Sequence, residues 1–89
     1  MKTVIDGYIY YTVKFNLKTV KDFVNTIYNF YAGIDAYQGK YIVDAKSILG
    51  MMSLNLLQPI TIKVYADDLT DEERHTLDIT LLPLLIQKN

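Results

Sequence analysis

Residues 4–15 alternate between a more apolar and a more polar side. A period of two residues is typical of a strand that packs one face on a core. The run is long for a single strand, so its later half is also a candidate for a loop. The side chains expected on the covered face are Ile5, Ile9, Tyr11, Val13 and Phe15.

The period changes to that of an amphipathic helix over residues 19–31. We expect Thr19 to be the N-cap of this helix, with Asp22 three residues later in a capping-box arrangement. Gly33 is expected just past its end, where a left-handed conformation favours glycine. The apolar positions recur three and four residues apart, at Val20, Phe23, Val24, Ile27, Phe30 and Tyr31.

The middle of the chain predicts a compact hairpin and then a short helix. Two runs that favour strands, Ile34–Tyr37 and Lys40–Val43, are joined by Gln38-Gly39, where glycine allows the positive φ of a two-residue turn. Lys46–Leu57 follows as a helix, which Gln58-Pro59 ends.

A strand and a helix are predicted for the last third of the chain. Alternation resumes over Ile60–Ala66, which indicates a strand. A helix over Asp71–Leu82 begins with a capping box of Thr70 and Glu73, and Pro83 ends or kinks it. The apolar residues after this proline are expected to pack on the domain or on a second subunit, and they are Leu84, Leu85 and Ile86.

The predicted order is strand, helix, strand, strand, helix, strand, helix, in one domain over residues 1–89. Helices interleaved with an antiparallel hairpin favour an α+β fold of two layers, in which a four-stranded antiparallel sheet is covered by three helices. With 51% hydrophobic and 21% charged residues, the chain has the composition of a globular domain.

Charge and cysteine content exclude several classes of site. The basic residues are scattered and the net charge is −1, so no nucleic-acid footprint is present. There is no cysteine, which excludes disulfides, zinc–thiolate sites and thiol nucleophiles. The first fifteen residues contain Asp6 and Gly7 and resemble neither a signal peptide nor a membrane span, so we expect a cytoplasmic protein with no membrane contact.

Three further residue groups have an ordinary structural interpretation. The acidic residues from Asp67 to Glu73 suit a solvated loop and a first helical turn, with a metal or basic-partner site as the alternative. His75 is the only histidine and is expected at the surface, because no second metal ligand is suitably spaced. The eight tyrosines are expected mainly to pack strands and helix faces, and they are Tyr8, Tyr10, Tyr11, Tyr28, Tyr31, Tyr37, Tyr41 and Tyr65.

The segment Gly39–Leu54 reads GKYIVDAKSILGMMSL. It resembles the regulatory segment of the HPr proteins, the small phosphocarriers of the bacterial sugar phosphotransferase system. The family pattern is Lys-Ser-Ile-hydrophobic-Gly-hydrophobic-Met-Ser-Leu, and Lys46–Leu54 fits it at every position. The resemblance extends more weakly over about residues 3–83 and implies an HPr-like open-faced sandwich of order βαββαβα.

The resemblance fails at the family's phosphoacceptor, a histidine in a Gly-hydrophobic-His-hydrophobic-Arg-Pro segment. Counting back from Ser47 without gaps places that histidine on Asn16, and the segment from Lys14 to Thr19 keeps only Lys18 as a positive charge. An asparagine amide has no nucleophilic lone pair with which to accept a phosphoryl group. We therefore expect no phosphocarrier activity, no enzymatic activity and no cofactor.

Ser47 has a structural and a functional interpretation that are compatible. As structure it is an N-cap of its helix, and by resemblance it is the regulatory serine that some HPr proteins have phosphorylated by an ATP-dependent kinase. On the helix that follows, we predict Met51 and Leu54 on the core side and an exposed apolar patch outside. The predicted partner-binding residues are Asn16, Lys18, Lys21, Ile48, Leu49 and Met52.

The expected partners are an HPr kinase or a transcriptional regulator, with the protein itself a monomer or weak homodimer. One alternative is a divergent phosphocarrier-pathway component in which a carboxylate takes the phosphate, and Asp22 is the nearest in sequence to Asn16. Another is a structural or oligomeric domain, which the apolar segment Leu81–Ile86 would favour.

Overall fold

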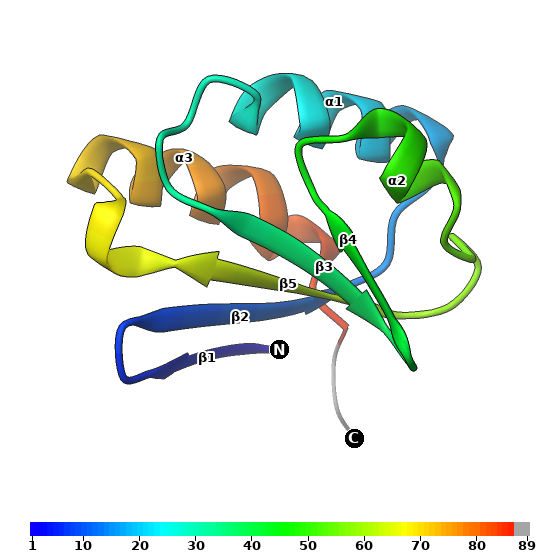
Figure 1. The fold of residues 1–89 in the computed structure, drawn as a ribbon, viewed down its shortest axis with the longest axis horizontal. Helices are drawn as coiled ribbons and strands as arrows, with labels where there is room; N and C mark the ends of the chain where they lie inside the picture. The colour runs from blue at the N-terminus through cyan, green and yellow to red at the C-terminus, as the bar shows by residue number, and fades with distance from the viewer. Residues whose placement is uncertain (87–89) are drawn as a thin grey trace.

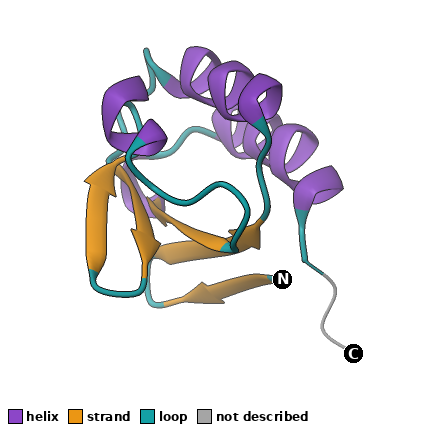
Figure 2. Cartoon of the chain, turned by 90° about the vertical axis from the view of Figure 1, so that its right-hand side faces the viewer, coloured by secondary structure: helices purple, strands orange, loops and turns teal. Residues whose placement is uncertain are grey.

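The computed structural model describes residues 1–86. The chain folds into a five-stranded antiparallel sheet with its helices on one face, and the opposite face is bare (Figures 1 and 2). The strands lie in the order β1-β2-β5-β3-β4. In chain order the elements are β1 (Lys2–Ile5), β2 (Tyr8–Val13), α1 (Leu17–Ile27), β3 (Ile34–Gln38), β4 (Tyr41–Asp44), α2 (Ile48–Met52), β5 (Ile60–Tyr65), η1 (Ala66–Asp68), α3 (Asp71–Leu81) and η2 (Leu82–Leu84).

The α+β class, the antiparallel sheet and the three α-helices agree with the prediction, but the prediction of four strands is wrong. The first predicted strand is a hairpin of β1 and β2, turned at Asp6 and Gly7. Both residues have positive φ, 43° and 83°, as a two-residue hairpin turn requires. Ile5 consequently leaves the predicted core face and is 52% exposed at the sheet edge.

The core lies between the sheet and the helices. Strand β2 alternates between half-buried and fully buried residues, and β5 does the same along most of its length, as the period of two predicts. Helix α1 contributes the apolar stripe found in the sequence. The largest fully buried side chains are Tyr11, Phe23, Ile9, Ile27, Ile34, Met51, Ile60, Ile62, Leu77, Leu81, Val13 and Val20.

Helix α1 begins earlier and ends earlier than its periodicity predicts. Asn16, and not Thr19, is the N-cap, and the helix stops at Ile27 with Tyr28 as C-cap. Tyr31 lies outside the helix and is 83% exposed, and Gly33 is not a left-handed cap residue. Phe30 and Tyr31 fit the helical period in the sequence, but both lie beyond the end of the helix.

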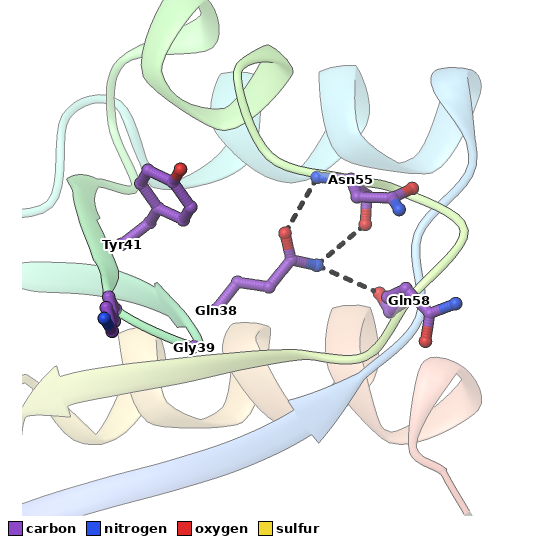
Figure 3. A pocket seen from close by; sticks show the side chains of 6 residues that line it. Gln38, Gly39, Tyr41, Asn55 and Gln58 are labelled. Atoms are coloured by element: carbon purple, nitrogen blue, oxygen red, sulfur yellow. Dashed lines mark hydrogen bonds between the residues drawn. The ribbon is translucent and has the colours of Figure 1, made fainter.

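The hairpin tip and α2 also differ in detail from the prediction. Gln38 pairs with Tyr41, so the turn residues are Gly39 and Lys40, with Gly39 at φ 58°. The Gln38 amide accepts from the Asn55 backbone N–H at 2.8 Å and donates to the Asn55 carbonyl at 2.8 Å (Figure 3). The predicted helix Lys46–Leu57 is shorter because the chain after Met52 instead forms the loop that Gln38 holds.

The segment after α3 packs on its own domain. The Lys14 N–H donates to the Leu84 carbonyl at 3.1 Å, and the Ile86 N–H donates to the Thr12 carbonyl at 3.0 Å. Leu85 forms a bridge with Val13, and Pro83 lies in η2, where it ends α3 as predicted. Of the two expected locations for this apolar segment, its own domain is the one observed.

The added strand β1 is fastened to α3 by a polar cluster. One Asp78 carboxylate oxygen accepts from the Lys2 ammonium at 2.8 Å and from the buried Tyr11 hydroxyl at 2.7 Å. Burial opposes the charge of Asp78, but the hydrogen bonds from Lys2 and Tyr11 outweigh it and lower its pKa. The carboxylate therefore stays charged at neutral pH and holds the N-terminal strand.

Among residues 1–86, no helix is long and apolar enough to cross a membrane.

Candidate functional site

The start of α1 is closed by a reciprocal pair of hydrogen bonds. The Asn16 side-chain oxygen accepts from the Thr19 N–H at 2.8 Å, and the Thr19 hydroxyl accepts from the Asn16 N–H at 2.8 Å. This is a complete capping box, with Asn16 in extended conformation before the helix. Asn16 is exposed, but its side-chain oxygen is occupied in starting the helix.

The two predicted lysines of α1 have different surroundings. The Lys18 ammonium lies 2.8 Å from the Asp22 carboxylate, one helical turn away, and both side chains are largely exposed. The hydrogen bond and charge of Asp22 raise the pKa of Lys18. Lys21 is exposed and faces α2 across a groove described below.

The start of α2 is held by hydrogen bonds of Ser47 and of Lys46, the residue before it. The Ser47 hydroxyl accepts from the Gly50 N–H at 3.0 Å, so Ser47 is the N-cap as predicted. The Lys46 N–H donates to the Asp44 carboxylate at 2.9 Å, and the Lys46 ammonium donates to the Phe30 carbonyl. A methyl group at Gly50 would lie 3.3 Å from the Ser47 hydroxyl, so glycine lets this turn close tightly.

Helix α2 divides its apolar residues between two faces as predicted. Met51 is fully buried and Leu54, just beyond the helix, is 7% exposed. On the outer side Leu49 is 82% exposed, while Ile48 and Met52 are each a little over one-third exposed. Contiguous exposed apolar residues on a small domain commonly mark a contact surface.

A groove of about 350 Å³ separates α1 from α2. It brings together Lys21 and Ile48, two of the predicted partner-binding residues. Asn16 and Lys18 instead make their side-chain contacts within α1, with Thr19 and Asp22. The residues lining the groove are Lys21, Val24, Asn25, Tyr28, Lys46 and Ile48.

Tyr28 and Asn25 were not predicted to belong to this surface. Tyr28 is 66% exposed and follows Lys21 and Asn25 along one face of α1. Their spacing of three and four residues is the signal in the sequence, but it identifies a shared face without identifying the neighbouring helix. The contact with α2 is a tertiary feature.

The remaining predicted sites lie on α3 and in the segment just before it. His75 is exposed on α3, and the carboxylates of the first turn of α3 include Glu73, which closes a capping box with Thr70. Thr70 accepts from the Glu73 N–H at 3.0 Å and Glu73 accepts from the Thr70 N–H at 3.0 Å. Within residues 1–86, no three His, Asp or Glu side chains gather closely enough to hold a metal ion.

Comparison with protein families gives a match to the family model described as "PTS HPr component phosphorylation site". It spans residues 13–80, from the last residue of β2 to the last turn of α3. No curated protein and no solved structure matches the chain. The added strand β1 lies outside the matched region, and most of the chain lies inside it. The chain therefore belongs to the HPr family, the phosphocarriers of the phosphotransferase system.

Proposed function

We propose that this HPr-family protein acts by docking to other proteins and does not itself carry phosphate. The proposal that the protein does not carry phosphate rests on the chemistry of Asn16. By the alignment from Ser47, Asn16 stands where the family has its phosphoacceptor histidine, and its amide oxygen serves as the N-cap acceptor of Thr19. An amide nitrogen is not a nucleophile near neutral pH, whereas imidazole is.

No other histidine replaces the missing one in α1. The only histidine is His75, which lies on α3. The carboxylate nearest in sequence to Asn16 is Asp22, and it is paired with the Lys18 ammonium at 2.8 Å. A carboxylate that is paired in this way would lose its ion pair on conversion to an acyl phosphate.

We further propose that Ser47 is phosphorylated by an ATP-dependent HPr kinase and that this switches recognition by a transcriptional regulator. The support is the full Lys46–Leu54 motif together with its surroundings. Ile48, Leu49 and Met52 are exposed immediately after Ser47, and Lys21 lies across the groove from Ile48. An added phosphate would put negative charge beside an adaptable apolar surface. It would also lie near the side of the groove that Lys21 lines.

The carrier half of this proposal is tested with radiolabelled phosphoenolpyruvate and Enzyme I. We expect no acid-labile, base-stable label on the protein, since such a label is the signature of phosphohistidine. The matched control is His75→Ala, which should behave as the unmodified chain does. Acid-labile, base-stable label on the unmodified chain that is lost in His75→Ala would show that His75 carries phosphate and would contradict the proposal. A base-labile label would indicate an acyl phosphate and would also contradict it.

The switch half is tested with HPr kinase and labelled ATP. We expect label on the unmodified chain and its loss in Ser47→Ala. Ser53→Ala is the matched control, because Ser53 also lies at an end of α2 and its hydroxyl donates to the Gly50 carbonyl at 2.6 Å. Equal labelling of all three proteins, or none with an active kinase, would remove Ser47 as a switch.

A further inference from the structure

The bare face of the sheet carries a cluster of tyrosines unrelated to the helix surface. Tyr8 and Tyr10 lie on β2, Tyr37 on β3 and Tyr65 on β5. The register pairs Tyr8 with Tyr65 and Tyr10 with Lys63. Directly paired residues of an antiparallel sheet point to the same face, and the alternate positions Ile9 and Val64 are fully buried beneath the helices. The tyrosine and lysine side chains therefore share the side away from the helices.

Lys63 lies at the centre of this cluster. Its ammonium is 4.4 Å from the centre of the Tyr8 ring and 5.2 Å from that of Tyr65. The rings of Tyr37 and Tyr10 lie 5.9 Å and 6.0 Å away. All four distances are within the range of cation–π attraction. Among the described residues, no carboxylate lies within 4 Å of this ammonium.

The ammonium is charged at neutral pH. Burial opposes its charge, but the surrounding tyrosines outweigh burial and raise the pKa of Lys63. Lys63 therefore presents a positive charge at neutral pH that the rings position and that forms no ion pair with a carboxylate of residues 1–86.

A depression of about 300 Å³ opens beside this charge. Tyr10 from β2 and Tyr37 from β3 line it on either side, and Thr61 and Lys63 line it from β5 between them. The size is at the lower end of ordinary small-molecule pockets. The depression combines aromatic walls, hydroxyl groups and one cation.

We propose that this depression binds a small aromatic carboxylate. The carboxylate would pair with the Lys63 ammonium, and the ring would lie between Tyr10 and Tyr37, where aromatic pairs gain from offset or edge contacts. One cation on a chain of net charge −1 suits a single negative charge and does not suit a polyanion such as nucleic acid.

Asp35 provides a second residue at which the proposal can be tested. It pairs with Lys63 in the register of β3 and β5, but its carboxylate accepts from the Tyr65 hydroxyl at 3.2 Å and does not line the depression. From the neighbouring strand, the negative charge of Asp35 repels an anion that approaches Lys63. Removing the charge of Asp35 should therefore act in the opposite direction from removing the charge of Lys63.

The experiment is an NMR titration of the full chain with phenylacetate. We expect saturable shift changes at Tyr10, Tyr37 and Lys63, with a dissociation constant on the order of 1 mM for so small a ligand. Lys63→Met should weaken binding about ten-fold, the effect of one charged hydrogen bond. Asp35→Asn should tighten it about two-fold, since the charge lies further from the ligand.

Two compounds and one spectrum serve as controls. Phenethylamine keeps the ring but reverses the charge, and cyclohexylacetate keeps the charge but lacks the flat ring, so both should bind more weakly than phenylacetate. A dispersed spectrum of each variant shows that it is folded. The proposal is overturned if phenylacetate gives no saturable shift up to about 10 mM, or if Lys63→Met binds it as well as the unmodified chain.

Discussion

Helices α1 and α2 both begin at a polar side chain that accepts from the backbone three residues later. The bond is 2.8 Å from Thr19 to Asn16 and 3.0 Å from Gly50 to Ser47. The two starts meet the same structural need, because the first amides of any helix lack partners within it. They differ in what the capping atom can do besides capping.

In the proposed function the Ser47 hydroxyl accepts a phosphoryl group from a kinase, and exposed apolar residues follow it. The Asn16 amide is a good cap and a poor nucleophile. Under the proposed function, the start of α1 keeps its structural role without a chemical one, whereas the start of α2 has both. Asparagine is among the best N-caps, so α1 has a strong start with Asn16 at this position.

The largest expected effect separates the two faces of α2. Met51→Ala should lower the free energy of unfolding by about 2–5 kcal/mol, because Met51 is fully buried. Met52→Ala should lower it by less than about 1 kcal/mol, because the side chain is already partly in water. Urea unfolding at constant m-value measures both. Equal losses would mean that the outer residues of α2 pack on the domain and are not available to a partner.

An intermediate effect tests whether the two caps are structurally equivalent. Asn16→Ala and Ser47→Ala should each lower the free energy of unfolding by about 1 kcal/mol, the usual value of an N-cap. Asn16→Asp is the control that retains an acceptor and should change stability by only a few tenths of a kcal/mol. If Asn16→Ala were neutral while Ser47→Ala were costly, only α2 would depend on its cap.

The smallest expected effect compares the lysines near each start. Lys46→Met should lower the free energy of unfolding by about 0.5–1 kcal/mol, because the half-buried Phe30 carbonyl loses its donor. Lys18→Met should have a smaller effect than Lys46→Met, because its pair with Asp22 is exposed and screened by water. Unfolding repeated in 1 M salt should remove most of the Lys18 effect and little of the Lys46 effect.

Much of the helix-side surface was predictable because its signals are local. The motif from Lys46 to Leu54 identified Ser47 as a cap, and the spacing of Met51 and Leu54 identified the buried side of α2. Helix bounds were less predictable where polar and apolar signals disagreed. Thr19 appeared to start α1 because the apolar stripe begins at Val20, while Leu17 is 58% exposed and adds nothing to the stripe.

The added strand was the main error in the fold, although its turn was visible. Asp6-Gly7 is a strong signal for a two-residue hairpin turn. The alternation continues on both sides of the turn, so the pattern predicts one long strand where the structure has β1 and β2. Once the chain folds back there, Ile5 pairs with Tyr8 on the bare face instead of continuing the core stripe.

The amino-acid sequence alone was enough to predict most of the buried side chains of β2, α1, α2 and β5 and the N-caps of α2 and α3, because these depend on periods and bonds within a few positions. It also determined the absence of an imidazole before His75. Only the tertiary structure decided that Lys21 meets Ile48 across a groove and that Lys63 lies among four tyrosines. Those groups come from separate helices and from three strands, and strand register, which long-range packing sets, brings the tyrosines together.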